Sequence, residues 1–198
     1  RRFPYSTDMT KNPLTYADLD PAQNAYPPGV PQSPVIGNTA NEVHNVGELW
    51  CMTLLECRAN MSVAHGFAAN DMIMRLAVDG MKLDTASDVN FLNERDGILQ
   101  SDLVNNGGAN QAAIWQAFAK RGQGASATSP ATATSGIVEA YDLPFRVDFT
   151  YPGGTPSQLL PGVATGFDVN LSPLLLTLVT NSGLLHYSVN GGAYQTRP

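Results

Sequence analysis

The sequence predicts a mainly α-helical lobe followed by a small antiparallel β-sandwich. Apolar residues recur at helical spacing from residue 41 to residue 124, and from residue 137 onward they alternate with polar residues. A hydrophobic content of 43% in 198 residues is enough to supply a core. We therefore expect four segments: an arm over 1–40, the helical lobe over 41–124, a linker over 125–136 and the β-sandwich-like domain over 137–198.

The arm over 1–40 is rich in proline. Its prolines are Pro4, Pro13, Pro21, Pro27, Pro28, Pro31 and Pro34. Proline has no amide hydrogen to donate and blocks helix formation, so the arm is expected to be irregular. A long irregular segment is unusual inside a compact domain. We expect the arm to pack on the lobe, and a partner domain that it wraps would also account for its length.

Four helices are expected in the lobe. Their predicted ranges are 42–64, 70–82, 88–104 and 111–121. Gly66 is expected to end the first helix in a left-handed conformation, and Ser87 or Asp88 is expected to cap the third. The Asn105-Asn-Gly-Gly108 run separates the third helix from the fourth.

Strand patterns follow an Ala/Ser/Thr run at 125–135, which is typical of a linker. Residues 145–149, 166–171 and 184–189 are predicted strands, and Asn190-Gly-Gly192 is expected to turn the last of them into a hairpin with 193–196. A domain of about 55 residues is short for two packed sheets. The predicted sandwich is therefore small, and short enough to lack its last strands.

The overall charge argues against two classes of partner. The formal net charge is -6 and the pI is about 4.8, so neither nucleic acid nor an anionic membrane surface is expected to bind. No run of 18 or more apolar residues is present, and no membrane span is expected. Because the chain opens on Arg1-Arg2-Phe3-Pro4 without an initiator methionine, we expect a processed or excised part of a longer protein.

Cys51 and Cys57 are expected to be free, buried thiols. Six positions on one helix separate them by about 9 Å along the axis. A disulfide needs α-carbons closer than about 7 Å. The two thiols are therefore not expected to pair with each other.

His44 is the first candidate for chemistry, because it lies at the start of the first predicted helix. The positive helix end disfavours the imidazolium form, while Glu48 one turn later favours it. A histidine balanced in this way can donate a hydrogen bond to a developing oxyanion. The alternative is a core histidine bonded to the arm. As metal ligands, His44 and Glu48 would be only two, and zinc needs three or four.

The remaining polar candidates have structural interpretations. His65 is expected to end the first helix, and His186 to be a cross-strand or surface residue. The third predicted helix carries a set of acidic residues: Asp88, Glu94, Asp96 and Asp102. We expect these to form a solvated face, because calcium ligation needs a glycine turn with alternating oxygen ligands. The chain has no His-Glu-x-x-His pair.

Several stretches of the sequence, in a fixed order, carry a family resemblance. They are Arg1-Arg-Phe-Pro-Tyr-Ser-Thr-Asp-Met-Thr-Lys-Asn-Pro-Leu-Thr-Tyr16, Glu42-Val-His-Asn-Val-Gly-Glu-Leu-Trp50, Asp79-Gly-Met-Lys-Leu83, Asp96-Gly-Ile-Leu-Gln-Ser-Asp102, and Gly107-Gly-Ala-Asn110 running on to Phe118-Ala-Lys-Arg-Gly122. Together they resemble the part after the active-site core in fungalysin-type metallopeptidases, which are thermolysin-like zinc endopeptidases of two lobes. The resemblance covers about 1–124, the C-terminal lobe. Residues 137–198 resemble, less specifically, the β-sandwich modules that often follow such peptidases.

The resemblance implies roles for two residues. His44 stands where the family has the histidine that hydrogen-bonds the tetrahedral oxyanion. Arg1, or less well Arg2, stands where an arginine binds the substrate carbonyl beside the cleaved bond. The family's zinc ligands and general base all precede Arg1, so no metal ligand is expected in this chain. Thr39 replaces the aspartate that orients the histidine in thermolysin, and Glu42 is the expected substitute.

The function implied is that of the C-terminal lobe of a secreted zinc metalloendopeptidase. The expected partners are a peptide or protein substrate and the N-terminal lobe that carries zinc, and calcium is a second cation that the resemblance allows. This chain by itself is expected to be inactive. The alternative is a non-catalytic binding or assembly module of a secreted or cell-surface protein, which the absent zinc motif and the short β end favour.

Overall fold

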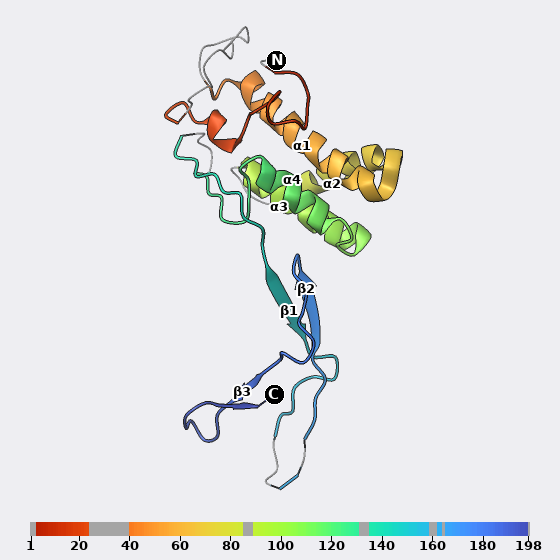
Figure 1. Ribbon diagram of the computed structural model, residues 1–198, viewed down its shortest axis with the longest axis vertical. Helices are drawn as coiled ribbons and strands as arrows, with labels where there is room; N and C mark the ends of the chain where they lie inside the picture. Colours follow the sequence, from red (N-terminus) through yellow and green to blue (C-terminus); the bar gives the residue numbers. More distant parts are fainter. Residues whose placement is uncertain are drawn as a thin grey trace. The chain divides into compact units, whose positions relative to one another are not determined.

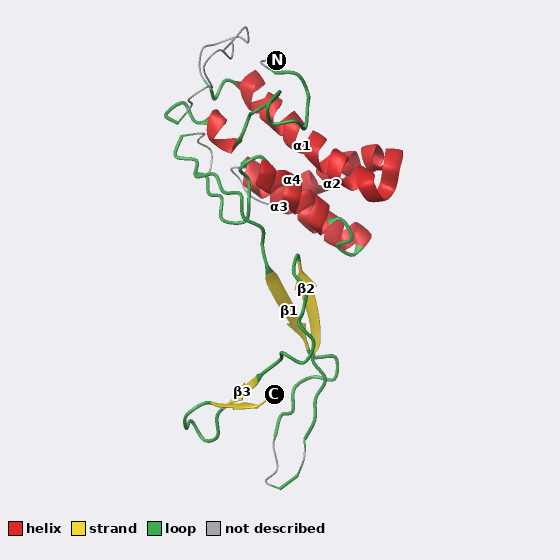
Figure 2. Ribbon diagram, in the orientation of Figure 1, coloured by secondary structure: helices red, strands yellow, loops and turns green. Residues whose placement is uncertain are grey.

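The computed structural model of the protein describes residues 3–23, 40–84, 89–130, 135–158, 162–163 and 165–197. The chain divides into two compact units, Arg1–Pro144 and Phe145–Pro198 (Figure 1). Helices form the first unit and short antiparallel strands lie in the second (Figure 2). This confirms the predicted fold class, a mainly helical lobe followed by a small antiparallel β region.

The helical unit contains the four helices that the sequence predicted. They are α1 (Val43–His65), α2 (Ala69–Leu83), α3 (Phe91–Asn106) and α4 (Gln111–Lys120), with two short 3-10 turns, η1 (Tyr16–Leu19) and η2 (Gly66–Ala68). α1 packs against α4 and α2, and α2 packs along α3. Each observed helix begins and ends within a few residues of its predicted range, because the apolar spacing that marks a helix is local.

Two predicted helix ends are wrong. Asn90 caps α3, with its side chain accepting the amide hydrogens of Leu92 and Asn93. Ser87 and Asp88, the predicted caps, lie outside the described residues. Gly66 does follow α1 with a positive φ of 57°, but its ψ of -134° is not that of a left-handed helix.

Two glycines allow α2 and α3 to approach closely. A β-carbon at Gly80 would lie 2.8 Å from the amide nitrogen of Ile98, and one at Gly97 would lie 2.8 Å from the carbonyl oxygen of Gly80. Such contacts are too short for any real β-carbon. The absence of a side chain at both positions therefore sets the distance between the two helices.

The described part of the proline-rich arm packs on the helices. One buried apolar cluster combines residues of the arm, of α1 and α3, and of the segment after α4: Phe3, Leu14, Tyr16, Leu19, Leu49, Leu92, Ala127 and Ile137. Burial of this apolar surface holds residues 3–23 against the lobe. Residues 24–39 of the arm lie outside the described residues.

Residues 122–130 and 135–142 belong to the helical unit by their hydrogen bonds. The amide of Gly124 donates to the carbonyl of Ala140, and Thr128 and Val138 exchange a pair of amide bonds at 2.9 Å. The Asp20 carboxylate of the arm accepts the amide of Gly136 at 2.7 Å. The unit boundary consequently falls after Pro144, later than the residue 137 at which the sequence pattern changes.

The described residues of the second unit form two separate antiparallel pairs. β1 (Arg146–Thr150) pairs with β2 (Asn170–Leu174), and β3 (Leu185–Tyr187) pairs with β4 (Gln195–Arg197). All four strands overlap or adjoin predicted ones, and Asn190 and Gly191 take positive φ values in the predicted turn. Apart from Arg146, whose side chain is not described, none of the described residues of this unit has a buried side chain. The packing of the two sheets into a sandwich stays a prediction.

Candidate functional site

His44 lies in the first turn of α1, where Glu42 is the N-cap residue. The Glu42 carboxylate accepts the backbone amide of His44 at 2.9 Å and contacts the ring nitrogen Nδ1 at 2.8 Å. The hydrogen bond with the His44 side chain, and then that with its amide, lowers the pKa of Glu42. One carboxylate therefore caps the helix and fixes the imidazole ring.

The imidazole of His44 faces the surface. Its side chain is 61% exposed, and within the described chain no hydrogen bond reaches Nε2. The alternative of a core histidine bonded to the arm is therefore wrong. The ring is held at Nδ1 and presents Nε2 outward, which is the arrangement of an oriented hydrogen-bond donor.

The Glu48 side chain contacts the N-terminal segment of the chain. Its side chain is buried, and its Oε1 accepts the amide of Phe3 at 2.9 Å. Phe3 follows Arg1 and Arg2 directly, and both arginines lie outside the described residues. The bond fixes the start of the described chain against α1, one helical turn after His44.

A buried ion pair holds a later part of the arm, residues 6–14, against α1 and α4. The Arg121 guanidinium, at the end of α4, contacts Glu56 of α1 through Nε at 3.0 Å and Nη2 at 2.6 Å. Its other bonds go to the backbone carbonyls of Ser6, Asn12 and Leu14. Every donor of the guanidinium is thereby used, which is what a fully buried arginine requires.

Lys120 adds to the contacts between Arg121, Glu56 and the arm, and we call this set of contacts the clamp. Its ammonium donates to the second Glu56 oxygen at 2.8 Å and to the Thr7 carbonyl at 2.6 Å. The clamp joins α1, α4 and the arm. Sequence reasoning missed it, because its partners are far apart in the chain, and the only local signal is an adjacent Lys120-Arg121 pair that is otherwise typical of a solvated helix end.

Two acidic residues of α3 are buried, and the predicted solvated face is wrong for them. Asp102 is fully buried and accepts the Asn110 amide at 3.0 Å and its side-chain amide at 2.7 Å. Asn110 in turn contacts Nε2 of His65 at 2.7 Å, at the predicted place of His65 on the last turn of α1. Asp96 is mostly exposed and pairs with Arg95. Asp102 therefore joins α3, α4 and α1.

Glu94 is the second of these buried acids. Its Oε1 is buried without a hydrogen-bond partner. Burial, together with the nearby Asp84 carboxylate, raises the pKa of Glu94 to about 7. Both causes act in the same direction and favour the neutral carboxyl group over the carboxylate.

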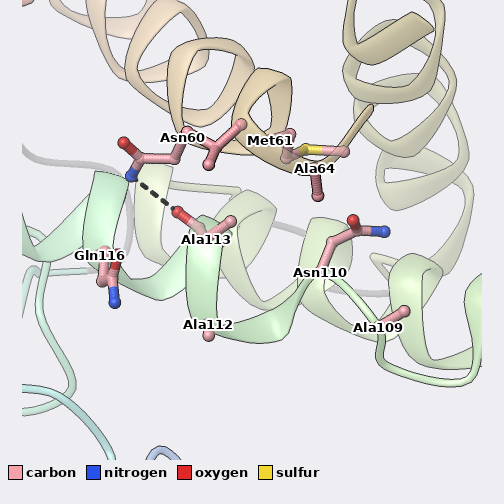
Figure 3. Close-up of a pocket in the computed structure, with 9 residues that line it drawn as sticks. Asn60, Met61, Ala64, Ala109, Asn110, Ala112, Ala113 and Gln116 are labelled. Atoms are coloured by element: carbon pink, nitrogen blue, oxygen red, sulfur yellow. Dashed lines mark hydrogen bonds between the residues drawn. The ribbon is translucent and has the colours of Figure 1, made fainter. Parts of the chain in front are cut away.

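A hollow of the helical unit lies elsewhere on α1. It is an open groove of about 330 Å³ between the last turns of α1 and the first turns of α4 (Figure 3). Asn60 crosses one end of it, donating to the carbonyl of Ala113 at 3.0 Å. Asn60 and His44 are sixteen positions apart on one helix, about 24 Å along its axis. The groove is therefore separate from the His44 surface.

The described residues do not provide a metal site. In those ranges no three His, Cys, Asp or Glu side chains lie close enough together to hold an ion. Zinc needs three or four such ligands, and calcium six or more oxygens. The residues described here do not fit either ion.

The other predicted residues are in structural positions. Cys51 and Cys57 are both free, but only Cys57 is buried, and the predicted burial of Cys51 is wrong because it lies on the exposed side of α1. Burial raises the pKa of the Cys57 thiol. His186 faces Thr196 across β3 and β4, with Nδ1 3.2 Å from the hydroxyl, as a cross-strand residue should.

Comparisons with known proteins give a consistent picture. Residues 1–127 match the model of the fungalysin metallopeptidase family (M36). The chain is 36% identical over 143 residues to the extracellular metalloproteinase MEP of Neosartorya fischeri, covering 64% of this chain and 19% of that protein. It is 35% identical over 161 residues to the extracellular metalloproteinase of Aspergillus terreus, 73% of this chain and 22% of that protein. The chain thus spans about a fifth of the length of these relatives. In the described residues, no helix is both long and apolar enough to cross a membrane.

Proposed function

The chain belongs to the fungalysin metallopeptidase family, and we propose that it is the C-terminal lobe of a secreted metalloendopeptidase. In this proposal His44 stabilises the oxyanion formed during peptide-bond hydrolysis, and Arg1 binds the neighbouring substrate carbonyl. The observation that carries the proposal is the exposed imidazole held by Glu42 at the start of α1. The extracellular enzymes among the relatives support secretion.

The Glu42 carboxylate holds the His44 ring at Nδ1 and leaves Nε2 for the substrate. A doubly protonated ring donates Nδ1–H to the carboxylate and keeps Nε2–H for the substrate oxyanion. A neutral ring with its hydrogen on Nδ1 has only an acceptor at Nε2, and it cannot donate. The doubly protonated ring is thus the form that can stabilise an oxyanion, and such a donor contributes about a hundredfold to a thousandfold in kcat.

The anchored N-terminal segment supports the role of Arg1. The Phe3 amide is bonded to Glu48, which lies one turn after His44 on α1. Two further residues span at most about 7 Å, and the arginine side chain adds to that reach. Arg1 can therefore share a site with His44, although its own position lies outside the described residues.

The catalytic metal belongs, in this proposal, to a lobe that this chain does not contain. The relatives are more than three times as long as this chain, since one matched segment makes up 64% of this chain and 19% of the relative, and they are named metalloproteinases. Bound zinc would supply the activated water in such enzymes. The described residues of this chain supply only the hydrogen-bond donor and the surface on which it is fixed.

The first test uses this chain alone. We expect no stoichiometric zinc by metal analysis and no casein hydrolysis, since a donor without the metal cannot activate water. Tight zinc binding or chelator-sensitive proteolysis by the isolated chain would contradict the division between lobes.

The second test uses a longer protein that includes the metal-bearing lobe. His44→Ala is expected to lower kcat by about a hundredfold or more with little change in KM. His186→Ala, an exposed histidine of the second unit, is the matched control and should leave kcat unchanged. Equal activity of the two variants would remove His44 from the mechanism.

A non-catalytic assembly role is the second candidate. It is favoured by the two separate strand pairs of the second unit, whose described side chains are all at least partly exposed. Unpaired strand edges can add a strand from another chain. If this role is correct, removing residues 145–198 abolishes the binding of a partner while the helical unit stays folded.

A further inference from the structure

An apolar stripe runs along an exposed side of α2 and the turn before it. It consists of Phe67, Met74, Val78 and Met81, which are 86%, 63%, 46% and 60% exposed. Their spacing of seven, four and three positions places them on one side of a helix. The residues that face the rest of the lobe are different ones: Ile73, Leu76, Ala77 and Gly80. We refer to the four exposed residues as the α2 stripe.

Charged residues follow one flank of the α2 stripe. Asp71, Arg75 and Lys82 are exposed and lie side by side on a helical projection, next to the stripe. Asp71 and Lys82 are equally distant from the point between Leu76 and Ala77. The opposite charges are thus placed symmetrically about the middle of α2.

We propose that the α2 stripe pairs antiparallel with the α2 stripe of a second copy of this chain. In an antiparallel pair about a twofold axis, the same flank of each helix meets its copy. Asp71 of one copy then faces Lys82 of the other, and this contact occurs twice. The Lys82 ammonium contacts Asp79 of its own chain at 2.7 Å, but its two remaining hydrogens are available to Asp71 of the second copy.

A parallel pair does not make these contacts. About a twofold axis parallel to the helices, this flank meets the opposite flank of the copy, and Asp71 no longer faces Lys82. The charged flank is therefore self-complementary only in the antiparallel pair, and this favours a second copy over an unrelated partner.

The size of the stripe sets the strength expected. Three side chains on a helix of fifteen residues, with Phe67 in the turn before it, form a contact smaller than a standard protein interface. The two methionines adapt to an opposing surface because their side chains are unbranched. We expect a dissociation constant of about 100 µM, a weak dimer. This inference does not depend on the peptidase function, since neither His44 nor Arg1 takes part.

The test is the mass of this chain measured by sedimentation from about 10 µM to about 1 mM, a range that brackets the expected dissociation constant. We expect a reversible shift from monomer to dimer. Val78→Asp should prevent it, whereas Val104→Asp, at an exposed valine of α3, is the matched control and should still dimerise. A monomer at every concentration, or a dimer that survives Val78→Asp, overturns the proposal.

The orientation has its own test. Lys82→Glu and Asp71→Lys should each weaken the dimer, by tenfold or more in dissociation constant, because each creates two like-charge contacts. The double variant restores opposite charges and should restore the dimer. Failure of the double variant to recover, with circular dichroism showing intact helices, overturns the antiparallel pairing. If the longer protein stays monomeric and the α2 amides exchange more slowly there than in this chain alone, the stripe belongs to the other lobe and the proposal is wrong.

Discussion

The helical unit and the β unit differ in how they fix a side chain. In the helical unit, buried polar groups connect segments that are far apart in the sequence, as Arg121 does between α1, α4 and the arm. In the described β unit, by contrast, the side chains are at least partly exposed and the strands pair only two by two. A reactive group needs a rigid support to keep its geometry. Of the two units, the helical one therefore has the packing that can hold a side chain in a fixed position.

The largest effect is expected from breaking the buried ion pair. Arg121→Met leaves the Glu56 carboxylate buried with Lys120 as its remaining charged partner, and should lower the free energy of unfolding by about 3–5 kcal/mol. Arg197→Met, at an exposed arginine of β4, should change it by less than about 0.5 kcal/mol. Urea unfolding followed by circular dichroism measures both. An equal loss of unfolding free energy in both variants would show that the two units do not differ in how they hold an arginine side chain.

The next effect concerns the close approach of α2 and α3. Gly97→Ala places a β-carbon 2.8 Å from the Gly80 carbonyl oxygen, so one helix must move. We expect a loss of about 1–3 kcal/mol in the free energy of unfolding. Gly183→Ala is the control in the β unit, where an added β-carbon meets no atom within 4 Å. Thermal unfolding of both variants tests whether packing is tight in one unit only.

A pH-dependent effect is expected at Glu94. Burial and Asp84 raise the pKa of Glu94 from an ordinary 4.5 to about 7. The unfolded chain therefore loses this proton at lower pH than the folded chain, and the folded state loses stability as the pH rises from about 4.5 to about 7. Glu94→Gln removes that loss. The free energy of unfolding of the variant, minus that of the wild type, should rise across this window and then level off.

A flat difference between pH 4 and pH 8 would show that the Glu94 carboxylate is solvated, contrary to its burial. Asp168→Asn supplies the comparison in the β unit, where the carboxylate is exposed. We expect no comparable rise in the difference in unfolding free energy between Asp168→Asn and the wild type. Urea titrations at several pH values give both curves.

The smallest effect on stability is expected at the candidate site itself. Glu42→Gln keeps an oxygen to cap α1 but removes the charge beside His44, so the free energy of unfolding should change by less than about 1 kcal/mol. Peptidase activity of a longer protein with the metal-bearing lobe should nonetheless fall by about tenfold to a hundredfold, because the imidazole loses its orienting carboxylate. An unchanged kcat would show that Glu42 acts only as a helix cap.

Much of this molecule could be predicted from its sequence, because the relevant signals are local. Helical spacing placed α1 to α4, alternation and glycine turns placed the strands, and the short separation of Glu42 and His44 allowed that pair to be anticipated. The N-cap of α3 was predicted at the wrong residue. Asn90 sits only a few residues from the predicted Ser87 and Asp88, and all three side chains are good caps.

Contacts between distant residues required the tertiary structure. Glu48 bonds to Phe3 across 45 positions, and Arg121 bonds to Glu56 across 65. Asp102 has the sequence context of a solvated helical face but is fully buried. A hydrogen bond between segments leaves no periodic pattern in the chain, and a charged residue becomes buried only where other segments supply its partners. The sequence therefore determined where the helices and strands form, while the assembled fold decided which polar groups are enclosed.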